Sequence, residues 1–588
     1  MLQIVASGSH LGDALAPCRK RTAEAASGGN DETPEPSKTV ALALSGGGWT
    51  AFSAQLGVIV GMMIAEGLLN GEANPSLEGI SLLDDVEFIS SVSGGSWLIT
   101  ELIYSSSFIA MVHKMAADPT QMQSIFATEW LQPYLDFLDD TDNLTEYINT
   151  LAQEQGSDSL NQMADFMGFF KRALNKQGTW SDVIKQFLKI TADIQPELIL
   201  NSAHANKWAQ GKVWMACNSL AFPHGQDQVW AYVSSPLGND YVRYWSASGT
   251  TASAPLVIPT KISWRIGDTA ATASPMPFVA QSALPFQSTL VWEGVQDAVD
   301  GEVVPSISTA WNSTTGPLGD LAALQRGTLP VYQVTASSSA LYGGMALDST
   351  DGMALSSTDD LFGLRGPVYA AAHPGEVRNP FAAASAILNS IATNDSVDEH
   401  ATNSLGEAGV VGLFDGAYTD NSAIGHAVEA GATSVTSLIW GGFRAIVRLF
   451  IEESFQASTV EGYPSAIFGL FTFPEATLKG ATACDHAQML FNGFPELDTN
   501  GSAYISSIQF GQIEVVTRAN AWFGIEAGRK VTLTVVNVNT TGGSLQDAGV
   551  SEADPAVVTK VASDVARALF APRNRATTKQ LMQSLKKP

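Results

Sequence analysis

This sequence of 588 residues contains few cysteines, few basic side chains and no long apolar run. The three cysteines, Cys18, Cys217 and Cys484, are far apart, which argues against a disulfide framework and against a cysteine-rich zinc site. No stretch reaches the roughly 18 apolar residues of a membrane span. The first residues also lack the basic and apolar parts of a secretory signal. These absences predict a cytoplasmic protein without a transmembrane segment.

The shortage of basic residues leaves a strong negative charge. Lys and Arg number 31 against 58 Asp and Glu, so the net charge is -27. This charge repels a phosphate backbone and argues against a nucleic-acid partner. It also disfavours docking onto anionic membranes through basic patches, so any peripheral membrane contact is expected to be apolar. Nothing in the sequence indicates an oligomeric state.

The chain divides into a leader and a large domain with insertions. Residues 1–37 are rich in small and charged side chains without hydrophobic periodicity, which predicts a disordered leader. Residues 38–588 form the domain. Its middle has helical patterns followed by irregular stretches rich in Ser, Thr, Gly and Pro, which predict cap-like insertions within about 107–405.

Short apolar strands alternate with glycine turns and helices at both ends of this domain. Residues 39–44 and 86–92 have the length and boundaries of buried strands, and each precedes a glycine turn and a helical pattern. The same character returns at 409–414 and 433–440. Strands at 513–517 and 531–538, a helix at 554–569 and a basic tail complete the expected elements. This order predicts an α/β domain with a mostly parallel sheet.

The first candidate motif is the run Ser45, Gly46, Gly47 and Gly48, between a strand and a helix. Backbone N–H groups of such a turn bind either a phosphate or the oxyanion of an acyl-transfer intermediate. The P-loop lysine and the full spacing of a dinucleotide-binding turn are both missing, so a nucleotide site is disfavoured. Taken alone, the run is also typical of an ordinary turn.

The second motif, Ser91-Val92-Ser93-Gly94-Gly95, lies between a strand and a helix, where a nucleophile elbow belongs. The sharp turn of an elbow exposes the serine hydroxyl and requires small neighbours, which this segment supplies. The same five residues are also compatible with a packing turn in which the serine has no function.

The third motif is Asp415-Gly416-Ala417, at the end of an apolar strand. A carboxylate at the edge of a parallel sheet is well placed to contact a ligand, although Asp-Gly is also a common turn pairing. The combination matters more than any single motif. A glycine run, an elbow serine and a strand-end aspartate, in this order, indicate acyl-transfer chemistry.

Three segments resemble the signature blocks of the patatin and cytosolic phospholipase A2 superfamily. They are SGGGWTAFSAQLGVIVGMM at 45–63, SSVSGGSWLITELIY at 90–104 and LFDGAYTDNSAI at 413–424. The small residues and Trp97 after Ser93, with the long path to Asp415, resemble the cytosolic phospholipase branch in particular. The resemblance implies a three-layer α/β sandwich with a central mostly parallel sheet and a large cap insertion.

The resemblance also implies a mechanism and a substrate class. Ser93 would attack an acyl ester with Asp415 as its base and without histidine, forming an acyl-enzyme. The oxyanion would be held at Gly46, Gly47, Gly48 and Gly94. The expected substrates are fatty-acyl esters of glycerolipids at a membrane or micelle surface, cleaved as by a phospholipase A or lysophospholipase, with no metal or cofactor. Acyl transfer to another lipid would use the same site.

Two positions depart from the family pattern. Thr50 stands where the cytosolic phospholipase branch has an arginine thought to meet the substrate phosphate, so a preference for phospholipid is not implied. Ser91 stands where the elbow usually begins with glycine, and it is still small.

Two other functions fit parts of the sequence. An α/β-hydrolase with a Ser–Asp–His triad would share the glycine run and the elbow, and would use His426 or His486. A catalytically silent scaffold could retain the fold and bind lipid or a partner protein.

Overall fold

The computed structural model describes most of the two ends of the domain and selected segments of its middle. The described residues are 38–139, 180–200, 204–221, 230–235, 238–243, 257–267, 298–299, 302–303, 330–339, 412–450, 469–499, 501–518, 525–540 and 555–587. The predicted leader at 1–37 and much of the range expected to hold the cap lie outside these residues.

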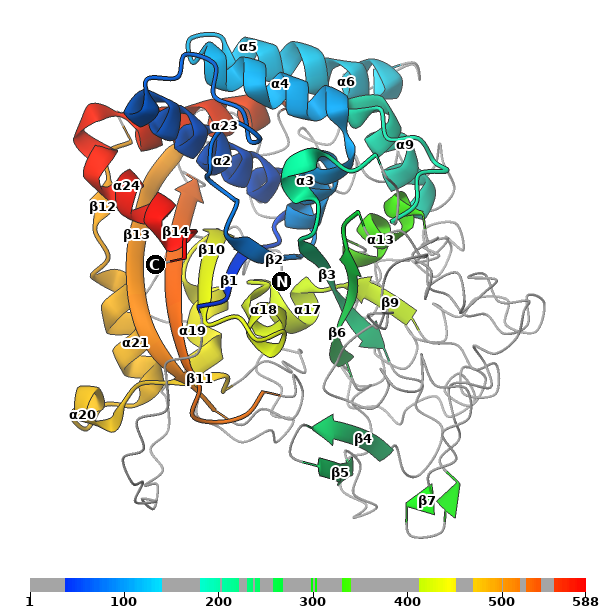
Figure 1. The fold of residues 1–588 in the computed structure, drawn as a ribbon, viewed down its shortest axis with the longest axis vertical. Helices are drawn as coiled ribbons and strands as arrows, with labels where there is room; N and C mark the ends of the chain where they lie inside the picture. The colour runs from blue at the N-terminus through cyan, green and yellow to red at the C-terminus, as the bar shows by residue number, and fades with distance from the viewer. Residues whose placement is uncertain are drawn as a thin grey trace, which may run out of the picture.

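A ten-stranded sheet runs through the middle of the protein, in the order β11-β13-β14-β10-β1-β2-β3-β6, with β12 beside β13 and β9 beside β3 (Figure 1). The five central strands, from β14 to β3, are parallel, and the outer strands pair antiparallel. The strands of this sheet are β1 (Val40–Leu44), β2 (Val86–Ser91), β3 (Val213–Ala221), β6 (Val257–Arg265), β9 (Gly412–Asp415), β10 (Ser434–Trp440), β11 (Phe471–Thr472), β12 (Glu496–Leu497), β13 (Ile505–Thr517) and β14 (Lys530–Thr540). Two small hairpins are separate from it, β4 (Trp230–Ser235) with β5 (Gly238–Arg243), and β7 (Ala298–Val299) with β8 (Glu302–Val303).

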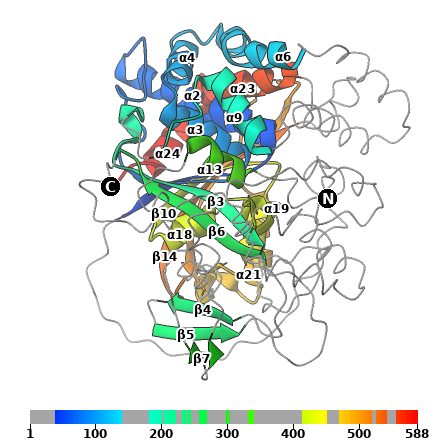
Figure 2. The same cartoon turned by 90° about the vertical axis from the view of Figure 1, so that its right-hand side faces the viewer.

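Helices lie on both faces of the sheet (Figures 1 and 2). One face carries α2 (Gly48–Asn70), α3 (Gly94–Tyr104), α4 (Ser106–Ala117), α5 (Met122–Phe126), the π-helical turn η1 (Ala127–Leu131), α6 (Gln132–Asp139), α9 (Trp180–Ala192), η2 (Lys207–Ala209), α13 (Val331–Ser338), α23 (Pro555–Phe570) and α24 (Arg575–Ser584). The other face carries α18 (Ile424–Glu429), α19 (Arg444–Val447), η4 (Arg448–Phe450) and α21 (Ala483–Asn492). The short segments α17 (Ala417–Asp420), α20 (Glu475–Leu478) and η5 (Pro572–Asn574) complete the set.

Strand β1 shows how the sequence produces this layering. Its five residues are all fully buried, and successive side chains of a strand point to opposite faces. Val40, Leu42 and Leu44 pack into the core beneath α2 and α23, whereas Ala41 and Ala43 pack into the core beneath α18 and α21. The mixed α/β class with helices flanking a central, mostly parallel sheet is therefore confirmed, and it is compatible with the predicted three-layer sandwich.

Helix α2 packs closely on α23 because two glycines leave room for it. A Cβ at Gly57 would lie 2.5 Å from Ala562 O, and one at Gly61 would lie 2.7 Å from Leu569 Cβ. Among helices of the described segments, α2 alone is long and apolar enough to cross a membrane, and 89% of its most apolar window is buried. Helices α3 and α4 pass the same test only as a pair, and they are bent by 97°.

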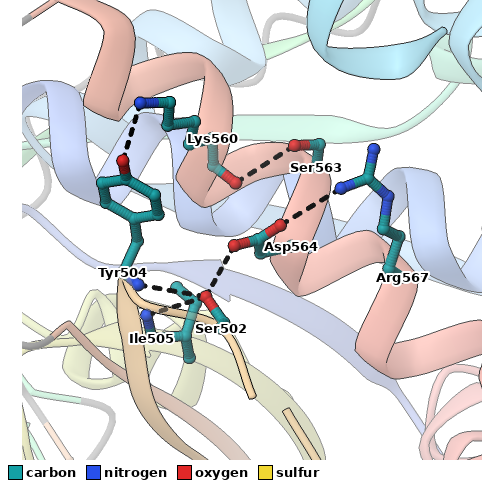
Figure 3. Close-up of polar contacts among 7 residues, drawn as sticks. All are labelled: Ser502, Tyr504, Ile505, Lys560, Ser563, Asp564 and Arg567. Carbon is teal, nitrogen blue, oxygen red and sulfur yellow. Dashed lines mark hydrogen bonds and ion pairs between the residues drawn. The ribbon is translucent and has the colours of Figure 1, made fainter. Parts of the chain in front are cut away.

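A polar network anchors α23 to the start of β13 (Figure 3). The Ser502 hydroxyl donates to Asp564 Oδ2 at 2.6 Å and accepts from the N–H groups of Tyr504 and Ile505 at 3.1 Å each. Lys560 Nζ donates to the Tyr504 hydroxyl at 2.6 Å. Because Ser502 already bonds to three partners, its pairing with an aspartate is structural, and it provides a control serine far along the chain from the candidate elbow.

Two sequence-based expectations change in detail. Strands β3 and β6 come from the range expected to hold cap insertions, yet they are part of the central sheet. The segment expected to be a basic tail forms helix α24, which buries Thr578, Leu581 and Met582 against the sheet layer.

Candidate active site

The glycine run and the elbow lie side by side at one edge of the sheet. Strands β1 and β2 are parallel neighbours, so the turns that follow them emerge together at the carboxyl edge, where ligands bind in open α/β sheets. The turns touch, because a Cβ at Gly94 would lie 2.1 Å from Gly48 O. Residues 45–48 and 93–95 therefore pack directly against each other.

Ser93 has the backbone conformation of an elbow. Its φ is 52° and its ψ is -123°, a region that side chains other than glycine rarely occupy. The residue is the N-cap of α3 and is 6% exposed. A strained serine between a strand and a helix is the geometry that presents a hydroxyl to a substrate.

Asp415 lies near Ser93 because one edge of β3 pairs with two different strands in succession. One edge of β3 pairs with β2 from Phe88↔Val213 to Ser91↔Ala216, and then with β9 from Asn218↔Asp415 onward. The other edge pairs with β6 throughout. Strand β9 therefore occupies the position that β2 vacates, and the two strands meet with their carboxyl ends facing. Asp415, the last residue of β9, lies directly beyond the end of β2, where Ser93 turns.

The next residue, Gly416, allows this meeting. A Cβ there would lie 2.6 Å from Cys217 O and 2.7 Å from Val92 Cγ2, so any larger residue would push the two strand ends apart. The sequence predicts that Asp415 ends a strand at the edge of a parallel sheet. The structure corrects the direction, because β9 runs antiparallel to β3.

The environment of Asp415 makes its carboxyl group a base near neutral pH. The side chain is fully buried, and burial raises its pKa to about 7, while the N–H of Ala417 and the nearby Ser93 side chain partly offset this rise. Asp415 Oδ1 accepts from Ala417 N–H at 2.8 Å. Among the described residues, Oδ2 has no hydrogen-bond partner, and the Ser93 side chain lies close enough to the carboxyl group to lower its pKa.

Three backbone N–H groups near Ser93 are candidates for holding an oxyanion. Gly47, Gly48 and Gly94 lie at the starts of α2 and α3, where N–H groups have no partner within the helix. Gly47 and Gly48 have φ values of 137° and 57°, which glycine adopts readily. The fourth predicted residue, Gly46, differs from these because its N–H donates to Asn421 O at 3.0 Å.

A chain of buried hydroxyls supports the elbow from below. Trp214 Nε1 donates to Ser91 Oγ at 2.9 Å, Ser91 and Ser96 Oγ are 2.9 Å apart, and Ser96 and Ser338 Oγ are 2.7 Å apart. Ser338 Oγ then donates to Cys217 O at 2.7 Å, and Ser338 O accepts from Ser93 N–H at 2.9 Å. Helix α13 thus fixes the turn at Ser93, although nothing in its sequence marks it as part of a site.

Replacing Ser338 with alanine is expected to lower the free energy of unfolding by about 1–3 kcal/mol, because Ser96 and Cys217 O lose their buried partner. Urea denaturation measures the change. The control is Ser506→Ala, an exposed hydroxyl on β13, which is expected to change stability by less than about 0.5 kcal/mol. Equal effects of the two substitutions would contradict the supporting role of Ser338.

The structure does not bring either candidate histidine to Ser93. His426 is buried on α18, and the hydrogen bonds described for Ser93 and Asp415 do not involve it. His486 lies on α21, where its ring packs at a steep angle on that of Phe473, with the ring centroids 4.6 Å apart. Within the described segments, no group of three or more His, Cys, Asp or Glu side chains could hold a metal ion.

Comparison with known proteins assigns no family. No protein-family model matches this chain, and no curated protein matches its sequence.

Proposed function

We propose that this protein is a serine acyl-hydrolase of the patatin and cytosolic phospholipase A2 type, with Ser93 as nucleophile and Asp415 as its base. The observation that carries the proposal is the meeting of β2 and β9, which puts a strained serine beside a buried carboxyl group with a pKa of about 7. A base with a pKa near the working pH is the most effective one.

In the first half of the proposed reaction, Asp415 removes the proton of Ser93 as Oγ attacks the ester carbonyl. The carbonyl oxygen becomes an oxyanion, stabilised by N–H groups of Gly47, Gly48 and Gly94. The tetrahedral intermediate collapses, the bond to the leaving alcohol breaks, and Asp415 returns the proton to that alcohol. The product is an acyl group on Ser93 Oγ.

In the second half, water attacks the acyl-enzyme and Asp415 takes one of its protons. Collapse of the second intermediate breaks the bond to Ser93 Oγ, and Asp415 gives the proton back to the serine. A fatty acid leaves, and the enzyme regains its starting form. This sequence of steps uses one carboxylate twice and needs no histidine.

A cluster of aromatic rings next to the oxyanion donors supports an apolar acyl group as substrate. Trp49 directly follows Gly48 and is partly exposed, and its ring lies 4.7 Å from Trp97 and 4.9 Å from Phe187 between ring centroids. Trp97 and Phe187 are buried, so the partly exposed Trp49 is the side chain of this cluster that an acyl chain would contact. Thr50 supplies no cation for a phosphate after the glycine run, so neutral glycerolipid esters fit at least as well as phospholipids.

Two alternatives have less support. A Ser–Asp–His triad requires a histidine bonded to the nucleophile, and neither His426 nor His486 lies there. A silent scaffold would have no reason to keep a strained nucleophile turn facing a buried carboxyl group, because such strain lowers stability.

Release of fatty acid tests the proposal. The purified protein would be incubated with mixed micelles that contain phosphatidylcholine, lysophosphatidylcholine or diacylglycerol, and free fatty acid would be quantified by mass spectrometry. We expect release by the wild type and by Ser502→Ala, the control serine, but only background release by Ser93→Ala. No release from any micelle, or equal release by Ser93→Ala, would overturn the proposal.

A further inference from the structure

We infer that Asn421 binds the water that cleaves the acyl-enzyme, and that it thereby favours hydrolysis over acyl transfer to an alcohol. The inference rests on the proposed function and names a further residue of that site. It concerns which nucleophile the acyl-enzyme accepts.

Asn421 faces the nucleophile across the glycine run. Its backbone carbonyl accepts from Gly46 N–H at 3.0 Å, which fixes the residue against the turn. The position that a Cβ on Gly46 would take lies 2.3 Å from Asn421 Oδ1 and 3.0 Å from Ser93 Cβ. The Asn421 amide oxygen and the Ser93 side chain therefore both pack against Gly46, and any larger residue there would force them apart.

The amide oxygen has no partner within the described structure. Asn421 Oδ1 is buried and accepts no hydrogen bond there. Asp415 Oδ2 is also buried and also accepts no hydrogen bond. Buried polar atoms are almost always paired, so each exception calls for an explanation. Among the hydrogen bonds of the described residues, none reaches either of these two acceptors, and the hydroxyl of Ser93 is a donor that lies close to both.

In the acyl-enzyme, Ser93 can no longer donate a hydrogen bond to Asn421 Oδ1 or Asp415 Oδ2. Ser93 Oγ then carries the acyl group and has no proton, so both acceptors require donors from the incoming nucleophile. Water has two. One proton goes to Asp415 Oδ2 as the water oxygen attacks the acyl carbon, and the other donates to Asn421 Oδ1 and stays on the new carboxylic acid. The bond to Ser93 Oγ breaks, and Asp415 returns its proton to the serine.

An alcohol cannot serve both acceptors. Its single proton must go to Asp415 for the attack to proceed, which turns its alkyl group toward Asn421 and leaves Oδ1 buried and unpaired. A site built to bond two hydrogens discriminates against a ligand that lacks one of them. Asn421 therefore favours hydrolysis by a hydrogen bond that only water can make.

Partitioning of one acyl-enzyme between two acceptors tests this inference. The enzyme would hydrolyse p-nitrophenyl butyrate at a fixed methanol concentration, and the ratio of methyl butyrate to butyric acid would be measured by gas chromatography. This ratio does not depend on how much of a variant is folded or on its rate of acylation. Asn421→Leu and Asn421→Ala remove the acceptor, Asn421→Asp retains one, and Asn492→Leu on the exposed end of α21 is the control.

We expect the ratio to rise about tenfold in Asn421→Leu and Asn421→Ala, which corresponds to the loss of one hydrogen bond. It should stay within about twofold of the wild-type ratio in Asn421→Asp and Asn492→Leu. An unchanged ratio in both acceptor-free variants, or an equal rise in Asn421→Asp, would overturn the role of Asn421 and leave the proposed function intact. Absence of any turnover by the wild type would instead overturn the proposed function itself.

Discussion

Ser93→Ala and Asp415→Asn are each expected to lower kcat/KM for an acyl ester by at least about 1,000-fold. Ser93→Ala removes the atom that forms the acyl-enzyme. Asp415→Asn removes the proton acceptor and keeps the size and most hydrogen bonds of the side chain, so the fold should tolerate it. Losses of this size are typical when one member of a nucleophile–base pair is removed.

The double variant separates a dyad from two independent groups. Residues that act as one unit show non-additive effects, so Ser93→Ala/Asp415→Asn should be no slower than Ser93→Ala alone. Spectrophotometric hydrolysis of a p-nitrophenyl ester measures all three. Matched controls exist in Ser502→Ala and Asp564→Asn, which remove a serine–aspartate pair outside the site (Figure 3). Full activity of Asp415→Asn would rule out Asp415 as the base.

The second large effect is on pH dependence. The mechanism needs Asp415 ionised, and its pKa is raised to about 7 by burial. We therefore expect kcat/KM to be low at pH 5, to rise about tenfold per unit up to pH 6, and to reach half its plateau near pH 7. An aspartate with an ordinary pKa would give a flat profile over that range. A profile that is already at its plateau at pH 5 would contradict the assignment.

The same pKa makes a prediction about stability. A carboxyl group whose pKa is raised on folding favours the folded state at low pH. That contribution is complete below pH 4 and is lost as the pH rises toward 7. An asparagine does not ionise, so Asp415→Asn does not lose this stability as the pH rises. The unfolding free energy of Asp415→Asn minus that of wild type should therefore increase by up to about 4 kcal/mol between pH 4 and pH 8. The comparison between the two proteins is needed because burial also raises the pKa of Glu101, to about 8.

Much of the fold could be predicted because its central elements have strong local signals. Strands β1, β2 and β10 are short apolar runs bounded by glycine or polar residues, and they appear within a residue or two of the predicted limits. Strand β13 is longer than predicted. Its first half mixes apolar residues with Ser, Gln and Gly and is only partly buried, so it lacks the apolar run by which the other strands were predicted. Helix α24 was not predicted because only two of its buried side chains, Leu581 and Met582, are apolar.

The sequence predicted which residues belong to the candidate site, but not how the fold brings them together. Three motifs pointed to Ser93, Asp415 and the glycine run. The position of Asp415 depends on β9 pairing with β3 beyond the end of β2, and no local sequence pattern shows that pairing. Ser338 and Asn421 were missed for a related reason. Both act through long-range contacts, with Cys217 O and Gly46 respectively, and a serine or an asparagine in a sequence gives no sign of such partners.

Labelling with a fluorophosphonate probe shows whether Ser93 is an activated nucleophile, as the proposed mechanism requires. The purified protein would be labelled with and without detergent micelles at pH 8, and the modified peptide would be identified by mass spectrometry. We predict one modification, on Ser93, that is absent in Ser93→Ala, strongly reduced in Asp415→Asn and retained in Ser502→Ala. An unlabelled wild type under both conditions, or labelling on another serine that persists in Ser93→Ala, would contradict the account.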